Sequence, residues 1–240
     1  MLASWHSRGA QPPAAAAGGS LTLVGSRTFT HAGTGSTFAI PLTSLMGGIA
    51  SAPRTGDLVV AFIGQAAQQN DDVTMPSGWS QLDRVQSVAV RSSDLYVIYK
   101  TMGATPDTGF DIVDGINSKH SIAVTIFVYE GASTAAPAFT TATGTATALC
   151  NPPAITPTVA GSIILSGGAS GHFSVVQTFG SSAFDAFLTV GVEGGSNDTT
   201  IGVGRFAWTA GAFDPAVFTF SGSDSTQFCW AALSLILIPA

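Results

Sequence analysis

The chain has 240 residues and a net charge of −6, with 45% hydrophobic residues but only 9% charged ones. All 14 acidic residues follow residue 56, so binding to nucleic acid is not expected, because phosphates need a cationic surface. No apolar run is long enough to span a membrane, and a surface with so little charge suggests that other subunits cover part of it.

Residues 1–20 are rich in alanine, glycine and proline and show no periodic pattern. This composition predicts an extended arm that docks on another protein, with a disordered tail as the alternative. Residues 11–13 (Gln-Pro-Pro) interrupt the place where a secretory leader would carry its apolar core, so the chain is expected to be made in the cytoplasm. The candidate partner-binding residues of the arm are Leu2, Trp5, His6, Arg8, Pro12 and Pro13.

Residues 21–240 carry the signals of β-strands. Examples are the short runs "GDLVVAFIG" (56–64), "DLYVIYKTM" (94–102) and "HSIAVTIFVYEG" (120–131). Turn residues separate such runs roughly every 8 to 12 positions, a spacing typical of an all-β antiparallel sandwich or barrel. Only residues 42–51 could form a helical turn, and the two adjacent glycines in that segment weaken it.

The stretch "VTMPSGWSQLD" (73–83) places Trp79 directly after a proline–glycine turn, at the start of an alternating strand. The first interpretation is a core anchor that fixes the register of this strand. The alternative is an exposed platform for a ligand. Trp79 and Trp208 are therefore the candidate residues for stacking on sugar rings.

Three blocks of the first half recur in the same order in the second half. Residues 55–61 align with 160–166, residues 99–112 with 207–220 and residues 115–129 with 222–236, at offsets of 105, 108 and 107. This predicts an internal duplication, with pseudo-repeats of about 21–131 and 132–240. The alternative is that any two β-meanders with similar turn spacing align in this way.

The duplicated halves could interleave as one domain, which we favour, or stand as tandem sandwiches. Residues 131–161 between them are rich in threonine, alanine and proline, so they could form a linker. However, Phe139, Thr141, Thr143, Thr145 and Thr147 alternate as they would on one face of an edge strand. The last strand, residues 229–238, is apolar on both faces, as expected for a strand at the centre of a closed core.

No motif for catalysis, a metal or a cofactor is present. The four histidines have no metal-ligand spacing, and the two glutamates, Glu130 and Glu193, lie far apart in the sequence. Acidic turns at 69–73, 196–200 and 222–226 are expected to cap local backbone, with a calcium site as the alternative. Cys150 and Cys229 are expected to be reduced packing residues, with a disulfide as the alternative. We therefore expect a protein that is not an enzyme and has no cofactor.

The combination "GDLVVAFIG…MPSGWSQLD…DLYVIYKTMG…SIAVTIFVYEG", followed by a second "AGSIILSGGA" block, resembles β-sandwich proteins of tailed bacteriophages and gene-transfer-agent-like particles. The resemblance covers about residues 21–240. It implies a jelly-roll-like fold and a role as a fibre, spike or decoration component of the virion, and it carries over no catalytic residue.

The resemblance also implies where the protein acts and with what. We expect it at the virion surface, attached through its N-terminal arm to capsid or tail subunits, and forming homo-oligomers, with a trimer as one form. No heptad or collagen-like stalk precedes the sandwich, which favours a short spike or capsid-surface protein over a long fibre. The alternative function is a carbohydrate-binding module that attaches to host-surface glycans. A polysaccharide depolymerase would need a pair of converging carboxylates, which the sequence does not indicate.

Overall fold

The computed structural model describes residues 19–32, 37–67, 73–88, 92–114, 121–145, 149–172, 178–181, 183–192, 198–221 and 229–240. Over these residues the chain contains strands and no helix, and every strand pairing is antiparallel. The predicted all-β antiparallel sandwich is therefore confirmed. None of the described elements is a helix that could cross a membrane.

The helical turn considered for residues 42–51 does not form. This segment is held along the first strand by backbone hydrogen bonds, including a pair between Ser26 and Met46 of 2.9 Å each. Ala50 also donates its N–H to the Val24 carbonyl at 2.9 Å. These bonds cover the outer edge of that strand, which would otherwise present unpaired backbone groups to solvent.

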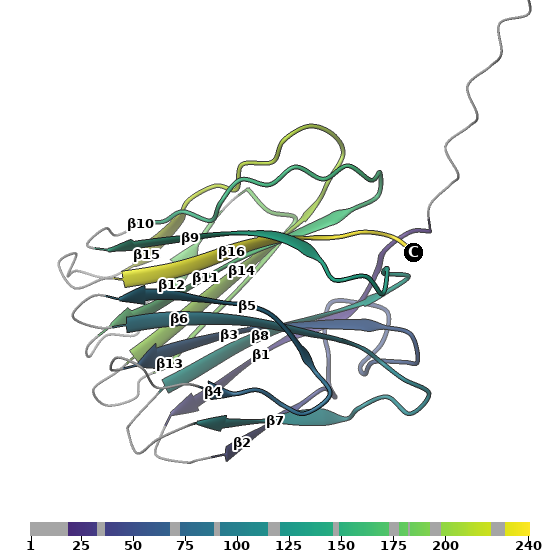
Figure 1. The fold of residues 1–240 in the computed structure, drawn as a ribbon, viewed down its shortest axis with the longest axis horizontal. Coiled ribbons are helices and arrows are strands. Elements are labelled where there is room, and N and C mark those ends of the chain that lie inside the picture. Colours follow the sequence, from purple (N-terminus) through teal and green to yellow (C-terminus); the bar gives the residue numbers. More distant parts are fainter. Residues whose placement is uncertain are drawn as a thin grey trace, which may run out of the picture.

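The first half of the chain forms a five-stranded and a three-stranded sheet (Figure 1). The larger sheet contains, in order, β1 (Thr22–Ala32), β8 (Ser121–Glu130), β3 (Leu58–Ala67), β6 (Ser92–Thr101) and β5 (Ser80–Val88). The smaller sheet contains β2 (Thr37–Pro41), β7 (Gly109–Asp114) and β4 (Val73–Thr74).

The second half is built in the same way. Its larger sheet contains β13 (Ala186–Val192), β14 (Asp198–Ala207), β11 (Ile163–His172), β16 (Cys229–Leu237) and β9 (Ala138–Thr145). Its smaller sheet contains β10 (Leu149–Cys150), β15 (Phe218–Ser221) and β12 (Thr178–Gly180). β9 is the edge strand that the threonine alternation indicated, and β16 is central and buried along its whole length.

Numbered within each half, both larger sheets have the strand order 1-8-3-6-5 and both smaller sheets the order 2-7-4. The strand pairing gives the offset between corresponding residues of the two halves. Leu58 of β3 pairs with Thr101 and Tyr129, and Ile163 of β11 pairs with Ala207 and Leu237. The offsets are therefore 105 between β3 and β11, 106 between β6 and β14, and 108 between β8 and β16. The first offset agrees with the sequence alignment, while along β6 and β8 the alignments of the second and third blocks differ from the strand pairing by two residues and one residue. The halves share a topology; their origin by duplication and the jelly-roll assignment stay predictions.

The turn before β3 shows how the two halves use different residues for one structure. Gly56 and its counterpart Gly161 both have positive φ angles, 86° and 79°, which favour glycine. The Asp57 carboxylate accepts a hydrogen bond from the Arg54 N–H at 2.7 Å, whereas the Ser162 hydroxyl donates to the Val159 carbonyl at 2.6 Å. Either side chain closes the turn, so the fold is kept although the sequence differs.

The largest hydrophobic cluster lies between the two five-stranded sheets, where Phe62, Phe127 and Leu233 are fully buried or nearly so. We call it the shared core. A second cluster fills the first half between its own two sheets, and two smaller clusters fill the second half. The molecule thus has four layers, with the three-stranded sheets outermost (Figure 1). Each half closes a sandwich of its own, and the shared core joins the two back to back.

The described part of the chain begins, at residue 19, and ends, at residue 240, at the same end of the molecule, which we call the terminal end (Figure 1). Ala240 donates its N–H to the Gly131 carbonyl at 2.9 Å, and a Cβ built on Gly19 would lie 3.5 Å from the Ala240 carbonyl oxygen. The opposite end, where each odd-numbered strand ends and the next even-numbered strand begins, is called the loop end.

Candidate binding groove

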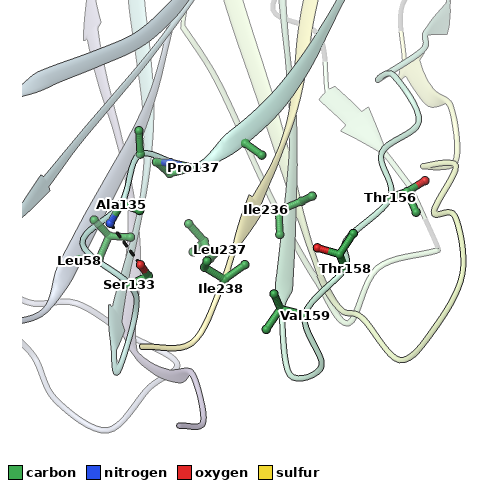
Figure 2. A pocket seen from close by; sticks show the side chains of 12 residues that line it. Leu58, Ser133, Ala135, Pro137, Thr156, Thr158, Val159, Ile236, Leu237 and Ile238 are labelled. Carbon is green, nitrogen blue, oxygen red and sulfur yellow. Dashed lines mark hydrogen bonds between the residues drawn. The ribbon is translucent and has the colours of Figure 1, made fainter. Parts of the chain in front are cut away.

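A groove of about 320 Å³ opens at the terminal end (Figure 2). One wall is strap 1, residues 133–138, which leads into β9, and the other is strap 2, residues 156–159, which precedes β11. The end of the chain runs between the two straps. The lining residues are Leu58, Ser133, Ala135, Ala136, Pro137, Ala138, Thr156, Thr158, Val159, Ile236, Leu237 and Ile238.

The lining of the groove is apolar and uncharged. Its polar side chains are the hydroxyls of Ser133, Thr156 and Thr158. The Ser133 hydroxyl accepts a hydrogen bond from the Ala135 N–H at 3.2 Å, and the Ser133 N–H donates to the Ile238 carbonyl at 2.9 Å, which holds strap 1 against the chain end. The volume is at the lower end of the range for ligand pockets. The groove can therefore bind an uncharged apolar group, and its lining offers no acid, base or thiol for catalysis.

Trp79 packs against the core of the first half. Its ring centroid lies 4.4 Å from that of Phe110, and the backbone N–H of Trp79 donates to the Pro76 carbonyl at 3.3 Å. Gly78 before it has a φ of 78°, which a tight turn requires. The side chain is half-buried, and this placement agrees with the core-anchor interpretation.

Trp208 lies at the start of the turn after β14, in the other half. It is half-buried, packs against the cluster of Ile155, Ile164 and Ile236, and donates its Nε1–H to the Gly211 carbonyl at 2.8 Å. The two tryptophans thus belong to different cores, and the structure does not gather them into one aromatic platform.

The candidate residues of the arm, Leu2, Trp5, His6, Arg8, Pro12 and Pro13, lie outside the described residues. So do the acidic turn residues at 69–72, 196–197 and 222–226. Glu193 is also outside, while Glu130 is exposed and lies 3.7 Å from the Arg54 guanidinium. Within the described ranges, no three His, Cys, Asp or Glu side chains are grouped to hold a metal ion.

Both cysteines are free and buried. Burial raises the pKa of the Cys150 thiol well above its usual value and that of Cys229 to about 12. The Cys150 sulfur lies against the backbone of Gly168, where a Cβ would be only 2.5 Å away. The thiols therefore act as packing groups, as predicted.

A buried polar cluster, which the sequence reasoning missed, lies toward the loop end. The Arg84 guanidinium donates to the Asp94 carboxylate at 2.8 Å and lies over the Tyr96 ring, 5.2 Å from its centroid. Asp94 is fully buried, and Gln65, also fully buried, is its cross-strand neighbour. The sequence signal for this cluster is one polar residue at an inward position of each of two apolar strands, Gln65 in β3 and Asp94 in β6.

Polar side chains at the same end also link the two halves. The Ser121 hydroxyl donates to Thr199 Oγ1 at 3.0 Å, and the Thr199 hydroxyl lies 3.0 Å from the Ser121 carbonyl oxygen. Nearby, the Ser87 hydroxyl donates to the Gly144 carbonyl at 2.9 Å. The shared core is therefore closed toward the loop end by buried hydrogen bonds, which fix how the sheets face each other.

Comparisons with known proteins identify no relative: no family model, no curated protein and no solved structure matches this chain. The likeness to phage virion proteins stays a prediction from sequence patterns.

Proposed function

We propose that this chain is a structural component of a bacteriophage virion, as a capsid-surface decoration, head spike or fibre, or tail-associated protein. It attaches through its N-terminal arm to capsid or tail subunits. The observation that carries the proposal is the position of Gly19, where the described chain begins: it lies beside Ala240 at the terminal end. A partner that holds the arm therefore meets this end and leaves the loop end facing away.

The surface chemistry supports a scaffold that contacts other proteins. Only 9% of the residues are charged, and exposed apolar side chains such as Met46 and Ile49 lie beside β1. Among the described residues, the buried carboxylates Asp57, Asp94 and Asp198 are in different strands or turns, and no three acidic, histidine or cysteine side chains are grouped together. These features favour assembly over catalysis.

A carbohydrate-binding module for host attachment is the alternative function. The structure gives it less support, because both tryptophans are half-buried. Trp79 lies directly before β5 and Trp208 directly after β14, so both are at the terminal end. In the proposed orientation this end faces the particle. A sugar site would then have to lie at the loop end, away from both tryptophans.

The test is incorporation into particles. The full-length chain with Leu2, Trp5 and Arg8 all changed to alanine should be absent from purified virions, while its circular dichroism and unfolding midpoint stay unchanged. The matched control changes Thr141, Thr143 and Thr145 on the exposed edge strand β9 to alanine and should be incorporated normally. Normal incorporation of the arm variant would contradict attachment through the arm.

A further inference from the structure

The mouth of the terminal groove lies next to the point where the arm begins. A Cβ on Gly131 would be 2.7 Å from the Ser20 carbonyl oxygen, and Gly131 is two residues before Ser133 in the groove lining. Ala240, which neighbours Gly19, is likewise two residues beyond Ile238, another lining residue. Two extended residues span at most about 7 Å. Both contacts, at Gly131 and at Ala240, therefore place residues 19–20 next to the rim of the groove.

The arm carries a segment whose chemistry matches this groove. Residues 10–17, "AQPPAAAA", have no charge and present mainly methyl groups and proline rings. Consecutive prolines favour an extended conformation that loses little entropy when it binds. The groove offers alanine, proline, valine and isoleucine walls with hydroxyl groups at its edge, and no charged side chain that would remain unpaired under an apolar segment.

We propose that residues 10–17 of the arm bind in the terminal groove of the same chain. Residue 17 is two positions from Gly19, so the segment is tethered at the rim by a very short linker. Such a linker gives an effective concentration in the millimolar range, which the arm of a second copy would not reach in dilute solution. The chain's own arm is therefore the occupant.

This binding assigns different tasks to the two parts of the arm. Residues 10–17 occupy the groove and fix the direction in which the arm leaves, while residues 1–9 extend beyond it with Leu2, Trp5, His6 and Arg8. The binding of residues 10–17 in the groove does not depend on the proposed function. Only the role of residues 1–9 in contacting a virion subunit rests on the proposed function.

Disulfide trapping in the full-length chain tests the proposal. Ala15→Cys is combined with Thr158→Cys in exposed strap 2, and the native thiols do not interfere because both are buried and their pKa values are raised. Mild oxidation with oxidised glutathione should give an intrachain crosslink, detected by mass spectrometry, at a rate independent of protein concentration. The matched control pairs Ala15→Cys with Thr74→Cys, exposed on β4 of the other half, and should not crosslink within the chain.

A second substitution separates specific binding from chance collisions. In the crosslinking background, Val159→Asp puts a charge at the groove and should slow trapping about tenfold, the change that 1.4 kcal/mol of binding free energy produces. Val113→Asp, at an equally exposed valine outside the groove, should leave the rate unchanged. Interchain crosslinks, no crosslink, or equal rates in both variants would overturn the proposal. A chain that traps normally but is absent from virions would support the groove assignment and contradict the proposed function.

Discussion

Phe62 on β3 lies directly against Gly167 on β11, across the shared core: a Cβ on Gly167 would be 2.4 Å from Phe62 Cδ1. These two residues occupy the same position in the two halves, because residues of β11 correspond to those of β3 at an offset of 105; we call such residues counterparts. The next inward pair, Gly64 and Ala169, are also counterparts, and a Cβ on Gly64 would lie 3.1 Å from the Ala169 Cβ. Counterparts meet only near a two-fold axis, so an approximate axis passes between β3 and β11.

The packing of the other strands has the same symmetry. β1 packs on β13 as β9 packs on β5, and β8 packs on β14 as β16 packs on β6. Two identical large side chains would collide at the axis, and two glycines would leave a void. The pairing of a phenylalanine with a glycine therefore explains why residues near the axis differ between the halves although the strand order is the same.

Gly167→Ala should destabilise the protein by about 1–3 kcal/mol, the usual cost of overpacking a core. The new methyl group would force the Phe62 ring or the β11 backbone to shift. Urea unfolding measures the change. Gly103→Ala is the matched control, because a Cβ there meets no atom within 4 Å. Equal effects of the two substitutions would show that the shared core is not packed against Gly167.

The contact between Phe62 and Gly167 should appear as an energetic coupling. Phe62→Ala alone should cost about 3–5 kcal/mol, because it leaves a cavity in the shared core. The double variant should cost less than the sum of the singles by about 0.5–3 kcal/mol, since the methyl group at position 167 partly fills that cavity. Additive costs in the same urea experiments would argue against direct contact.

The sequence indicated the fold class and the repeat but not the exact pairing, and β5 shows why. Strict alternation places Leu82 and Val85 on opposite faces, yet both pack in the shared core. A β-bulge between Gln81 and Asp83 inserts one residue, so residues three positions apart reach the same face. A bulge of this kind has no reliable sequence pattern.

The groove was also beyond sequence reasoning, for a different cause. Its walls come from residues 133–138, residues 156–159 and the chain end, which are distant in sequence and share only small apolar or hydroxyl side chains. For the Thr/Ala/Pro-rich stretch that supplies both straps, the sequence predicts a linker or an edge strand. It forms an edge strand over β9, while the segment before β9 and the segment after β10 form the two walls of the groove.

Asp94→Asn should destabilise the protein by about 3–5 kcal/mol, because it leaves the Arg84 guanidinium without its buried carboxylate partner. The matched control is Asp107→Asn, which breaks the more exposed pair of Lys100 and Asp107, 2.5 Å apart. A surface pair that stays partly in contact with water contributes only about 0–1 kcal/mol. Unfolding free energies of the two variants at pH 7 make the comparison, and similar losses would contradict a buried role for Asp94.

The native protein should not react with a thiol reagent such as Ellman's reagent at pH 8. Both thiols are buried, and burial raises the pKa of Cys150 well above its usual value and that of Cys229 to about 12, which leaves almost no reactive thiolate at that pH. After denaturation in guanidinium chloride, both cysteines of each chain should react. Rapid labelling of the folded protein would show that the second-half core around Cys150 or the loop end around Cys229 opens readily.

Asp57 should make a pH-dependent contribution to stability with an unusual sign. Burial raises the pKa of its carboxyl above the ordinary value of 3.8, and the nearby Glu130 raises it further, while the Arg54 N–H and guanidinium oppose the shift. Between the unfolded and the folded pKa values, the folded state binds more protons than the unfolded state. The contribution of Asp57 to the free energy of unfolding therefore falls as the pH rises through this window and is constant above it.

Asp57→Asn isolates this contribution. The asparagine amide oxygen can still accept the Arg54 N–H, but the side chain no longer ionises. The free energy of unfolding of the native protein minus that of the variant should decline from pH 3.8 upward until the raised pKa is passed. A difference that instead grows with pH would mean that the Arg54 contacts outweigh burial and hold the pKa of Asp57 below its ordinary value.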